Sequence, residues 1–437
     1  MNKKVSSRSK ASTLVLFVKN FCLLFAFRGV SVLTNFVVTI LAGRSLTVEQ
    51  MGEYNLVFSL SNVLVIPLVM GCNNSLLKVL PESSSKDKKE IMGTVFIGNI
   101  VLCLVLSAVG YAVTPLVCRI PNLSPNSWYI SIALAIATNS CIMIDTILKV
   151  DERFIKLGVA KIIGSVFMLA GYLISIGVFH RISICSFILW NVLGQVVVLL
   201  VSLYKLGAVK FVFRKDLIKI IYGVGAFYML SWLLTTGLNT ADICIISALR
   251  PKYESGIFNT YQSNIRTYFT VFYNDIFAAV MLPVLINHGT DLKGLVSKVM
   301  KFIPVIFLVL SGGTAVLLAL LLFAYGEQYP IIWSYILLES AGIAFQGLYY
   351  FFNSLLVLEG EAGAKTSFAV LAKSFAVLLI ITFVGTKLFG LMGGFVSFTV
   401  NQAILASILI LRYWKMLQGG EEGQKDYSLK ENKSYCS

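Results

Sequence analysis

The sequence predicts an all-α polytopic membrane protein with about twelve transmembrane helices in two pseudo-symmetric six-helix bundles. Three observations lead to this prediction: an apolar composition, apolar runs of bilayer length, and basic residues concentrated in alternate connections. The 437 residues are 57% hydrophobic and only 13% charged, with a mean hydropathy of +0.83. Runs of about 20 apolar residues span a bilayer as helices. Because these runs do not alternate apolar and polar residues, they favour helices over barrel strands.

Twelve apolar runs cover most of the chain. The predicted spans are residues 14–42, 54–79, 91–117, 128–148, 158–179, 183–204, 220–248, 256–286, 301–325, 330–357, 365–386 and 391–414. The connections between them are short, which leaves no room for a soluble domain. The predicted organisation is a cytoplasmic N-terminal segment (1–13), an N-terminal bundle (14–206), a cytoplasmic basic linker (207–219), a C-terminal bundle (220–415) and a disordered cytoplasmic tail (416–437).

Basic residues divide unevenly between the two sides of the predicted membrane. Of the 36 Lys and Arg residues, 24 lie in the terminal segments and every second connection, and six lie in the intervening connections. The positive-inside rule then places both termini in the cytoplasm. The net charge of +15 is therefore explained by membrane topology, and we expect no nucleic-acid partner. The six remaining cations lie within spans: Lys19, Arg28, Lys78, Lys161, Arg266 and Lys373.

Cysteine and histidine usage predicts neither a metal site nor a cofactor. Most of the eight cysteines lie in apolar runs, and no two form a Cys-x-x-Cys pair. The two histidines, His180 and His288, are far apart in the sequence. The cysteines are therefore expected to pack as small hydrophobic residues.

The two halves of the chain repeat a short pattern at a constant offset of 204 residues. The matching pairs are Asn35 with Asn239, Gly52 with Gly256, and Asn55 with Asn259. Each half thus places a helix, a short loop, and then Gly-x-aromatic-Asn at the opening of the next helix. Two six-helix repeats of this kind are typical of transporters, whose ligand site lies near the membrane midplane between the repeats.

The first loop carries a motif that resembles a known family. Residues 40–46 read Ile-Leu-Ala-Gly-Arg-Ser-Leu, and residues 49–54 read Glu-Gln-Met-Gly-Glu-Tyr. This stretch resembles the first-loop signature of polysaccharide-export proteins in the multidrug/oligosaccharidyl-lipid/polysaccharide exporter superfamily. The resemblance is closest to bacterial O-antigen (Wzx-type) flippases. Two departures are Met51, where the family often has phenylalanine, and Gly43 ahead of Arg44.

The resemblance implies a flippase rather than an enzyme, with both termini in the cytoplasm and the chain in the bacterial inner membrane. Such proteins move an undecaprenyl-diphosphate-linked oligosaccharide from the cytoplasmic to the periplasmic leaflet by alternating access. The implied partners are this lipid-linked substrate, membrane lipids and other polysaccharide assembly proteins. A path for the anionic diphosphate needs cations, and arginine suits phosphate because its guanidinium binds it through two parallel hydrogen bonds.

Arg28 is the basic residue nearest the middle of the first span. A charge there costs at least about 2.5 kcal/mol unless it faces the protein interior or a wet cavity. Helical spacing places Asn35 and Thr39 within about 20° of Arg28, so the three form one stripe. By the same reasoning, the predicted substrate-binding residues are Arg28, Asn35, Asn62, Asn239, Arg266, Gln346 and Lys373.

Acidic residues within the spans are candidates for ion coupling. They are Asp145, Asp242, Asp275 and Glu339. Seven-residue spacing keeps Glu339, Gln346 and Asn353 on one face of the tenth span. Each of these polar residues also has a structural interpretation, because polar side chains hold membrane helices together at about 0.6 kcal/mol each. In that interpretation Arg28 forms an ion pair with Asp145 or with Asp242.

Two other functions stay open. A drug/cation antiporter of the same superfamily would be expected to line its cavity with acidic residues, whereas the mid-span residues here include several cations. A membrane-embedded glycan polymerase or transferase would be expected to carry a large external loop, a soluble domain or an acidic metal motif. The sequence contains none of these, which favours a transporter.

Overall fold

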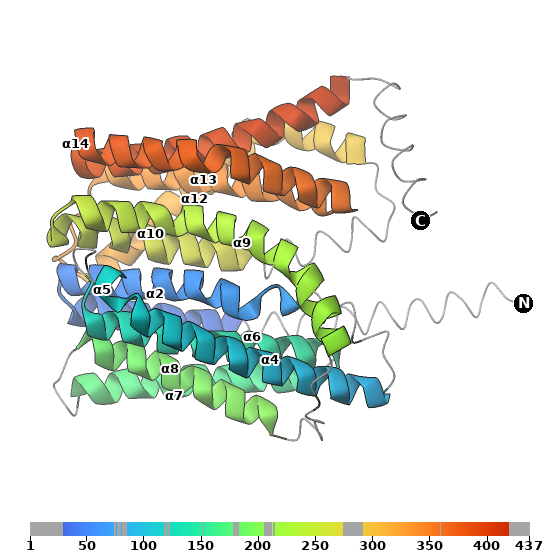
Figure 1. Ribbon diagram of the computed structural model, residues 1–437. Helices are drawn as coiled ribbons and strands as arrows, with labels where there is room; N and C mark the ends of the chain where they lie inside the picture. Colours follow the sequence, from blue (N-terminus) through green and yellow to red (C-terminus); the bar gives the residue numbers. More distant parts are fainter. Residues whose placement is uncertain are drawn as a thin grey trace, which may run out of the picture. The chain divides into compact units, whose positions relative to one another are not determined.

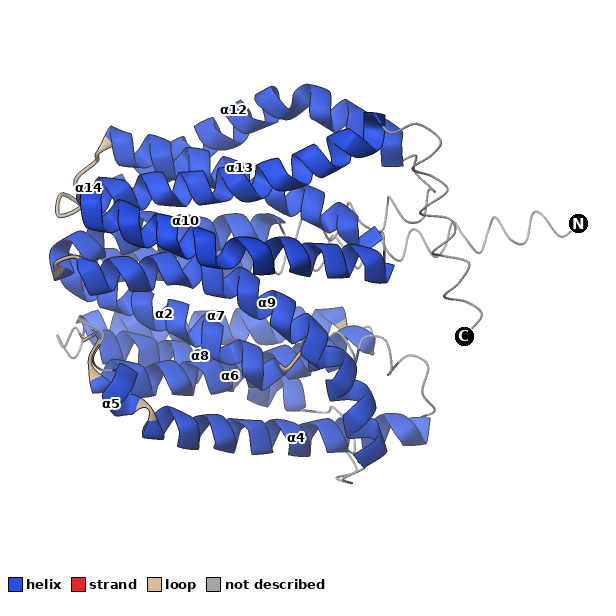
Figure 2. Cartoon of the chain, turned by 45° about the horizontal axis from the view of Figure 1, so that its top comes forward, coloured by secondary structure: helices blue, strands red, loops and turns tan. Residues whose placement is uncertain are grey.

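The computed structural model describes residues 29–73, 85–117, 123–151, 153–177, 183–204, 215–273, 292–358 and 360–418, with a few isolated positions between them. All regular secondary structure in these ranges is helical (Figure 2). Two residues predicted to be functional, Arg28 and Asp275, lie outside the described residues, as does the tail from residue 419.

The helices follow the order that the hydropathy pattern predicts (Figure 1). They are Gly29–Ser45, α2 (Val48–Val69), α4 (Ser85–Ala112), α5 (Thr114–Val117), α6 (Pro125–Val150), α7 (Phe154–Gly177), α8 (Ile184–Leu203), α9 (Lys215–Leu249), α10 (Lys252–Val271), α12 (Leu292–Tyr325), α13 (Trp333–Leu358) and α14 (Gly360–Gln418). Gly390, at φ 63° and ψ −145°, divides α14 into two helices. With the short α5 set aside, the described residues contain twelve helices, and the predicted fold class is confirmed.

Eight helices in the described part of the chain are long and apolar enough to cross a membrane. This number is smaller than twelve for identifiable reasons. The two helices of α14 count as one, and only the part Gly29–Ser45 of the first apolar helix lies in the described residues. The helices α10 and α13 carry buried polar residues, which lower their hydropathy although they lie among the other spans. A hydropathy threshold alone therefore underestimates helices whose polar faces pack inside the protein.

The described chain divides into two compact units. The first unit extends to Thr260 and also includes Ala324–Tyr329, whereas the second consists of Tyr261–Phe323 and the residues from Pro330 onward. The first unit therefore includes α9 and the beginning of α10, although the sequence predicts that the helix after the linker at 207–219 belongs to the C-terminal bundle. The bundle boundaries expected from the sequence stay a prediction.

In the first unit, α2 is largely buried, as is α6, and it packs against α6, α9, α4 and α8. A hydrogen-bonded group holds α2, α7 and α8 together. The hydroxyls of Tyr54 and Tyr172 lie 2.9 Å apart, and the Asn191 side chain donates to the Tyr172 hydroxyl at 2.6 Å. By contrast, α4 exposes apolar side chains such as Leu104, as a helix facing lipid is expected to do.

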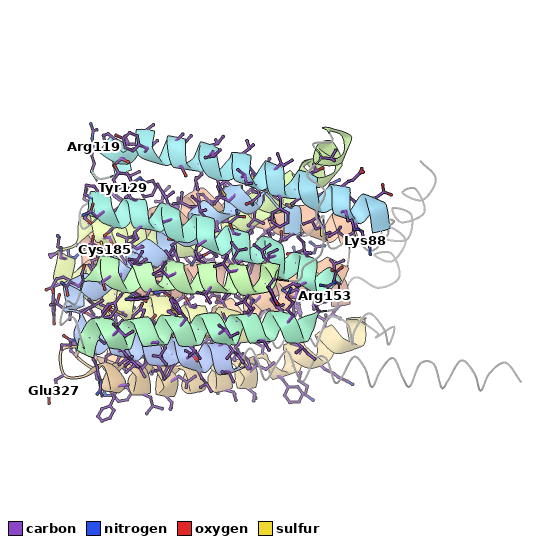
Figure 3. All side chains as sticks on the ribbon, turned by 90° about the horizontal axis from the view of Figure 1, so that it is seen from below. Lys88, Arg119, Tyr129, Arg153, Cys185 and Glu327 are labelled. Atoms are coloured by element: carbon purple, nitrogen blue, oxygen red, sulfur yellow. The ribbon has the colours of Figure 1, made fainter. Side chains whose placement is uncertain are left out.

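The two ends of the first unit differ in charge, as the alternating connections predict. In Figure 3, Lys88 and Arg153 lie at one end, which we call the basic end. Arg119, Tyr129 and Glu327 lie at the other, which we call the opposite end. Connections that alternate along the chain therefore lie at alternate ends of this unit.

In the second unit, α13 packs along α14 (Figure 1). The two helices of α14 form a tight hairpin on either side of Gly390. Ser397 Oγ donates to the Ile381 carbonyl at 3.1 Å, and a Cβ on Gly393 would collide with the Gly385 carbonyl. Glycine is therefore required where these two helices approach most closely.

Candidate functional site

The loop that carries the family-like motif is held by a capping box at the start of α2. Thr47 Oγ1 accepts a hydrogen bond from the Gln50 backbone N–H at 3.3 Å, and Gln50 Oε1 accepts one from the Thr47 N–H at 3.1 Å. These two bonds satisfy backbone donors that a helix start leaves open. The loop and the first turn of α2 are therefore fixed relative to each other.

The same loop is tied to the end of α12 at the opposite end of the first unit. Arg44 Nε donates to the Ala324 carbonyl at 2.6 Å, and the Gln328 side-chain amide donates to the Gly43 carbonyl. A Cβ on Gly43 would collide with the Tyr325 ring, so glycine is required there. The Gly43 departure from the family signature thus has a packing explanation in this chain.

The helices α2 and α10 cross at two glycines. A Cβ on Gly52 would lie 2.6 Å from the Gly256 Cα, and a Cβ on Gly256 would collide with the Val48 carbonyl. Two asparagines bond across the crossing. Asn55 Nδ2 donates to the Asn259 carbonyl at 3.3 Å, and Asn259 Nδ2 donates to the Gly52 carbonyl at 3.1 Å. We call these four residues, Gly52, Gly256, Asn55 and Asn259, the glycine crossing.

The glycine crossing joins residues that the sequence relates by the 204-residue offset. Gly52 contacts its own repeat partner, and the two asparagines contribute equivalent side chains in opposite directions. Equivalent residues touch each other in this way only beside a two-fold axis. The repeat pattern was the sequence signal for this site, although it predicted equivalence and not contact.

A small pocket of about 120 Å³ lies beside the glycine crossing. The residues that line it include Glu49, Glu53 and Lys252. Glu53 is held in place because its Oε1 accepts hydrogen bonds from Ser127 Oγ at 2.7 Å and from the Ser124 N–H at 3.2 Å. Ligand pockets usually measure about 300–1,000 Å³, so this pocket has room for water or a small group but not for a glycan headgroup.

Two ionisable groups near the opposite end, Arg250 and Tyr329, have raised pKa values. Arg250 Nε donates to Glu254 Oε2 at 2.7 Å, and this hydrogen bond raises the pKa of Arg250 above its ordinary value. Burial raises the pKa of the Tyr329 hydroxyl, and the nearby charge of Glu49 adds to the rise. Arg250 therefore stays cationic and Tyr329 stays neutral near pH 7.

The predicted substrate-binding residues of the first unit differ in exposure. Asn35 and Asn62 are exposed, and Asn62 is one of the few exposed positions on α2. Asn239 is half-buried, and Asp242 is buried with its Oδ1 accepting from the Ile243 N–H at 2.8 Å. In the first unit, Asn35 and Asn62 are thus the predicted substrate-binding residues that are exposed.

Asp145 forms an ion pair that joins α6 to α7. Its Oδ2 lies 2.5 Å from Lys161 Nζ, and its side chain is largely buried. The sequence had offered Asp145 or Asp242 as a partner of Arg28, which lies outside the described residues. The structure pairs Asp145 with Lys161. Its Oδ1 is buried without a hydrogen-bond partner among the described residues. A role in ion coupling stays a prediction.

In the second unit, the predicted polar face of α13 is buried. Glu339 and Gln346 are both almost inaccessible to solvent, and Asn353 is half-buried. Gln346 Nε2 donates to the Tyr350 hydroxyl at 2.9 Å, and Ser367 Oγ donates to Asn353 Oδ1 at 2.6 Å. The seven-residue spacing therefore identified a real face of α13, and that face belongs to the interior of the second unit.

The two predicted cations of the second unit lie in different surroundings. Arg266 is 7% exposed, and its guanidinium carbon lies 4.3 Å from the centre of the Phe398 ring. A Cβ on Gly342 would collide with the same ring, which places Phe398 one turn along α13 from Glu339. Lys373, by contrast, is exposed on α14. The structure thus brings Arg266 and Glu339 into one buried region and leaves Lys373 at the surface.

The sequence of the chain matches a known protein family. A family model described as "Polysaccharide biosynthesis protein" matches residues 17–288. No curated protein sequence matches the chain significantly.

Solved transporter structures match nearly the whole chain. A MATE-family multidrug resistance transporter of the MOP superfamily, in an inward-facing conformation, has a TM-score of 0.69 at 14% identity, covering 89% of this chain and 94% of that one. The lipid II flippase MurJ in an inward closed conformation has a TM-score of 0.68 at 14% identity, covering 90% and 87%. An outward-facing MATE-family transporter has a TM-score of 0.58 at 13% identity, covering 92% and 95%. At these identities the likeness shows a shared fold.

Proposed function

We propose a transport function from the premise that this chain belongs to the polysaccharide biosynthesis protein family. Its function is to move an undecaprenyl-diphosphate-linked oligosaccharide, an O-antigen repeat unit, from the cytoplasmic to the periplasmic leaflet by alternating access. The family match is the observation that carries the proposal. The fold supports it, because the solved structures that match nearly the whole chain are membrane transporters, and one of them is a lipid flippase.

The proposed orientation places the basic end in the cytoplasm of a bacterial cell, with the chain in the inner membrane and both termini inside. Lys88 and Arg153 at this end support the orientation, because positively charged connections are retained on the cytoplasmic side. The opposite end, with the glycine crossing, then faces the periplasm.

The ligand's polar headgroup is proposed to meet the polar residues predicted from the sequence. Asn35, Asn62 and Lys373 are exposed and accessible without rearrangement. Arg266 and Gln346 are buried in the second unit, so they reach a ligand only if that unit rearranges. Asn239 and Arg28 complete the proposed set, and the proposed ion-coupling residues remain Asp145, Asp242, Asp275 and Glu339.

A drug/cation antiporter is the second candidate. The favouring observation is the fold shared with MATE-family transporters, together with the buried carboxylates of Asp242 and Glu339. The buried Arg266 weighs against it, because a cation in the same buried region as Glu339 repels a cationic drug.

A deletion strain tests the proposal directly. We expect cells without this protein to accumulate a lipid-linked glycan on the cytoplasmic leaflet and to lose surface polysaccharide, and the intact gene to restore both. The measurement is the accessibility of the lipid-linked glycan to an external glycosidase in spheroplasts. Unchanged glycan distribution, together with a lowered tolerance to cationic drugs, would contradict the flippase and favour the antiporter.

A further inference from the structure

We propose that the first unit binds the phosphate group of a membrane phospholipid at its opposite end. Three residues form the site: Tyr111 in the last turn of α4, Tyr129 near the start of α6, and Arg119 in the connection that follows α5. We call these residues the tyrosine–arginine patch. The ligand is a lipid of the surrounding bilayer, so the inference does not depend on which substrate the protein transports.

Tyr111 continues the lipid-facing side of α4. It lies seven residues after Leu104, and this spacing keeps both residues on one helical face. The side chains of Tyr111 and Leu104 are 72% and 66% exposed, and Val109 between them is 51% exposed. Tyrosine is enriched where a lipid-facing helix leaves the hydrocarbon and reaches the lipid headgroups. The place of Tyr111, in the last turn of α4, therefore corresponds to headgroup level.

The two tyrosine rings are held in a fixed arrangement. The ring of Tyr129 stacks on that of Tyr111, with centroids 6.3 Å apart and planes inclined by 19°. Beneath the rings, Trp128 Nε1 donates to the Gly110 carbonyl at 2.9 Å, which ties α6 to α4. A Cβ on Gly110 would collide with the Ile132 side chain, so the two helices approach closely at this level. The exposed rings therefore lose little freedom when a ligand binds.

Arg119 adds a cation to the patch without a carboxylate to neutralise it. It is the only charged residue of the sequence between Glu90 and Asp145. Its backbone N–H donates to the Leu116 carbonyl at 3.2 Å, and Figure 3 shows Arg119 at the same end of the unit as Tyr129. The Arg119 side chain is exposed and forms no hydrogen bond or ion pair within the part of the chain that the structure describes. Its guanidinium is therefore available to an anion.

A phospholipid matches both the charge of the patch and its apolar surroundings. The lipid phosphate accepts two parallel hydrogen bonds from the Arg119 guanidinium, and the tyrosine hydroxyls are further donors. The acyl chains then lie along the exposed side chains of Val109 and Leu104. Free phosphate matches only the arginine and gains nothing from the apolar face. Because the patch carries a net positive charge, it favours an anionic lipid such as phosphatidylglycerol.

Titration of the full-length protein in detergent with phosphatidylglycerol tests the patch, with native mass spectrometry to measure bound lipid. We expect Arg119→Gln to raise the Kd about fivefold, the effect of one basic residue near a membrane surface. Tyr111→Leu keeps an apolar side chain but removes the hydroxyl and the stacked ring, so it should weaken binding several-fold. The matched control is Lys252→Gln, which removes an exposed cation beside Glu49 and Glu53 and should leave the Kd unchanged.

Equal Kd values for Arg119→Gln and the unaltered protein would overturn the proposal. An equal loss of affinity in Lys252→Gln would also overturn it, because net charge alone would then explain binding. Inorganic phosphate, added in excess over the lipid, should not displace phosphatidylglycerol. Displacement would show that the patch binds a free anion instead of a lipid. Arg119→Lys keeps the charge and should retain most of the affinity, and an unchanged unfolding midpoint without lipid confirms that each variant folds.

Discussion

At the scale of single residues, burial separates polar groups that sequence patterns place in one class. Arg266 and Lys373 were both predicted to bind the ligand because each is a cation within a span. In the structure, Arg266 is buried against the Phe398 ring, whereas Lys373 is exposed. A desolvated cation over an aromatic ring contributes about 2 kcal/mol. Arg266 is therefore a stabilising residue as well as a proposed ligand contact.

This difference leads to opposite expectations for two substitutions. We expect Arg266→Ala to lower the thermal unfolding midpoint of the detergent-solubilised protein by several degrees, through a loss of about 2 kcal/mol. Lys373→Ala should leave the midpoint unchanged and reduce glycan export several-fold. The two measurements are a melting curve and a complementation assay. Equal unfolding midpoints of the two variants would contradict the stabilising role of Arg266. Arg266→Lys is the control variant, because it keeps the positive charge.

The pairing of Asp145 with Lys161 shows why residue partners were not predictable. Both residues were identified from the sequence as charges within spans. Their 2.5 Å contact depends on α6 and α7 packing side by side with a particular rotation. Periodicity specifies the face of one helix. It does not specify which face of another helix lies opposite.

At the scale of helices, the hydropathy pattern predicted the number and order of elements well. The hydropathy pattern succeeded because a spanning helix must be apolar over the thickness of a bilayer and must hydrogen-bond its own backbone polar groups. Both requirements hold whatever helices lie beside it. The boundaries followed less closely, since capping groups such as Thr47 at α2 determine them. The glycine crossing shows what the sequence did not predict. The offset of 204 residues identified Gly52 and Gly256 as equivalent positions, but only the structure shows that they are in contact.

The hairpin of α14 depends on one backbone conformation. Gly390 has φ 63° and ψ −145°, a region that residues with a Cβ adopt only at a cost of about 1–3 kcal/mol. We expect Gly390→Ala to lower the free energy of unfolding in detergent by this amount. The measurement is the thermal unfolding midpoint, which should fall. Gly312→Ala in α12 is the matched control, because its added Cβ meets no atom within 4 Å. Loss of stability in the control but not in Gly390→Ala would contradict this account.

At the scale of the whole molecule, the strongest sequence signal is the unequal distribution of basic residues. The structure adds that alternate connections of the first unit lie at opposite ends, with Lys88 and Arg153 at one and Arg119 and Glu327 at the other (Figure 3). Which end faces the cytoplasm follows from the positive-inside rule. The direction of the proposed transport depends on it.

Cysteine labelling in intact cells tests this orientation. We expect Glu327→Cys to react with a membrane-impermeant maleimide added outside, because it lies at the end with few basic residues. Lys89→Cys, at the basic end, should react only after the inner membrane is made permeable. A permeant maleimide that labels both variants provides the control for thiol reactivity, and the native cysteines provide the background. Labelling of Lys89→Cys from outside would reverse the orientation, and the glycine crossing would then lie at the cytoplasmic side.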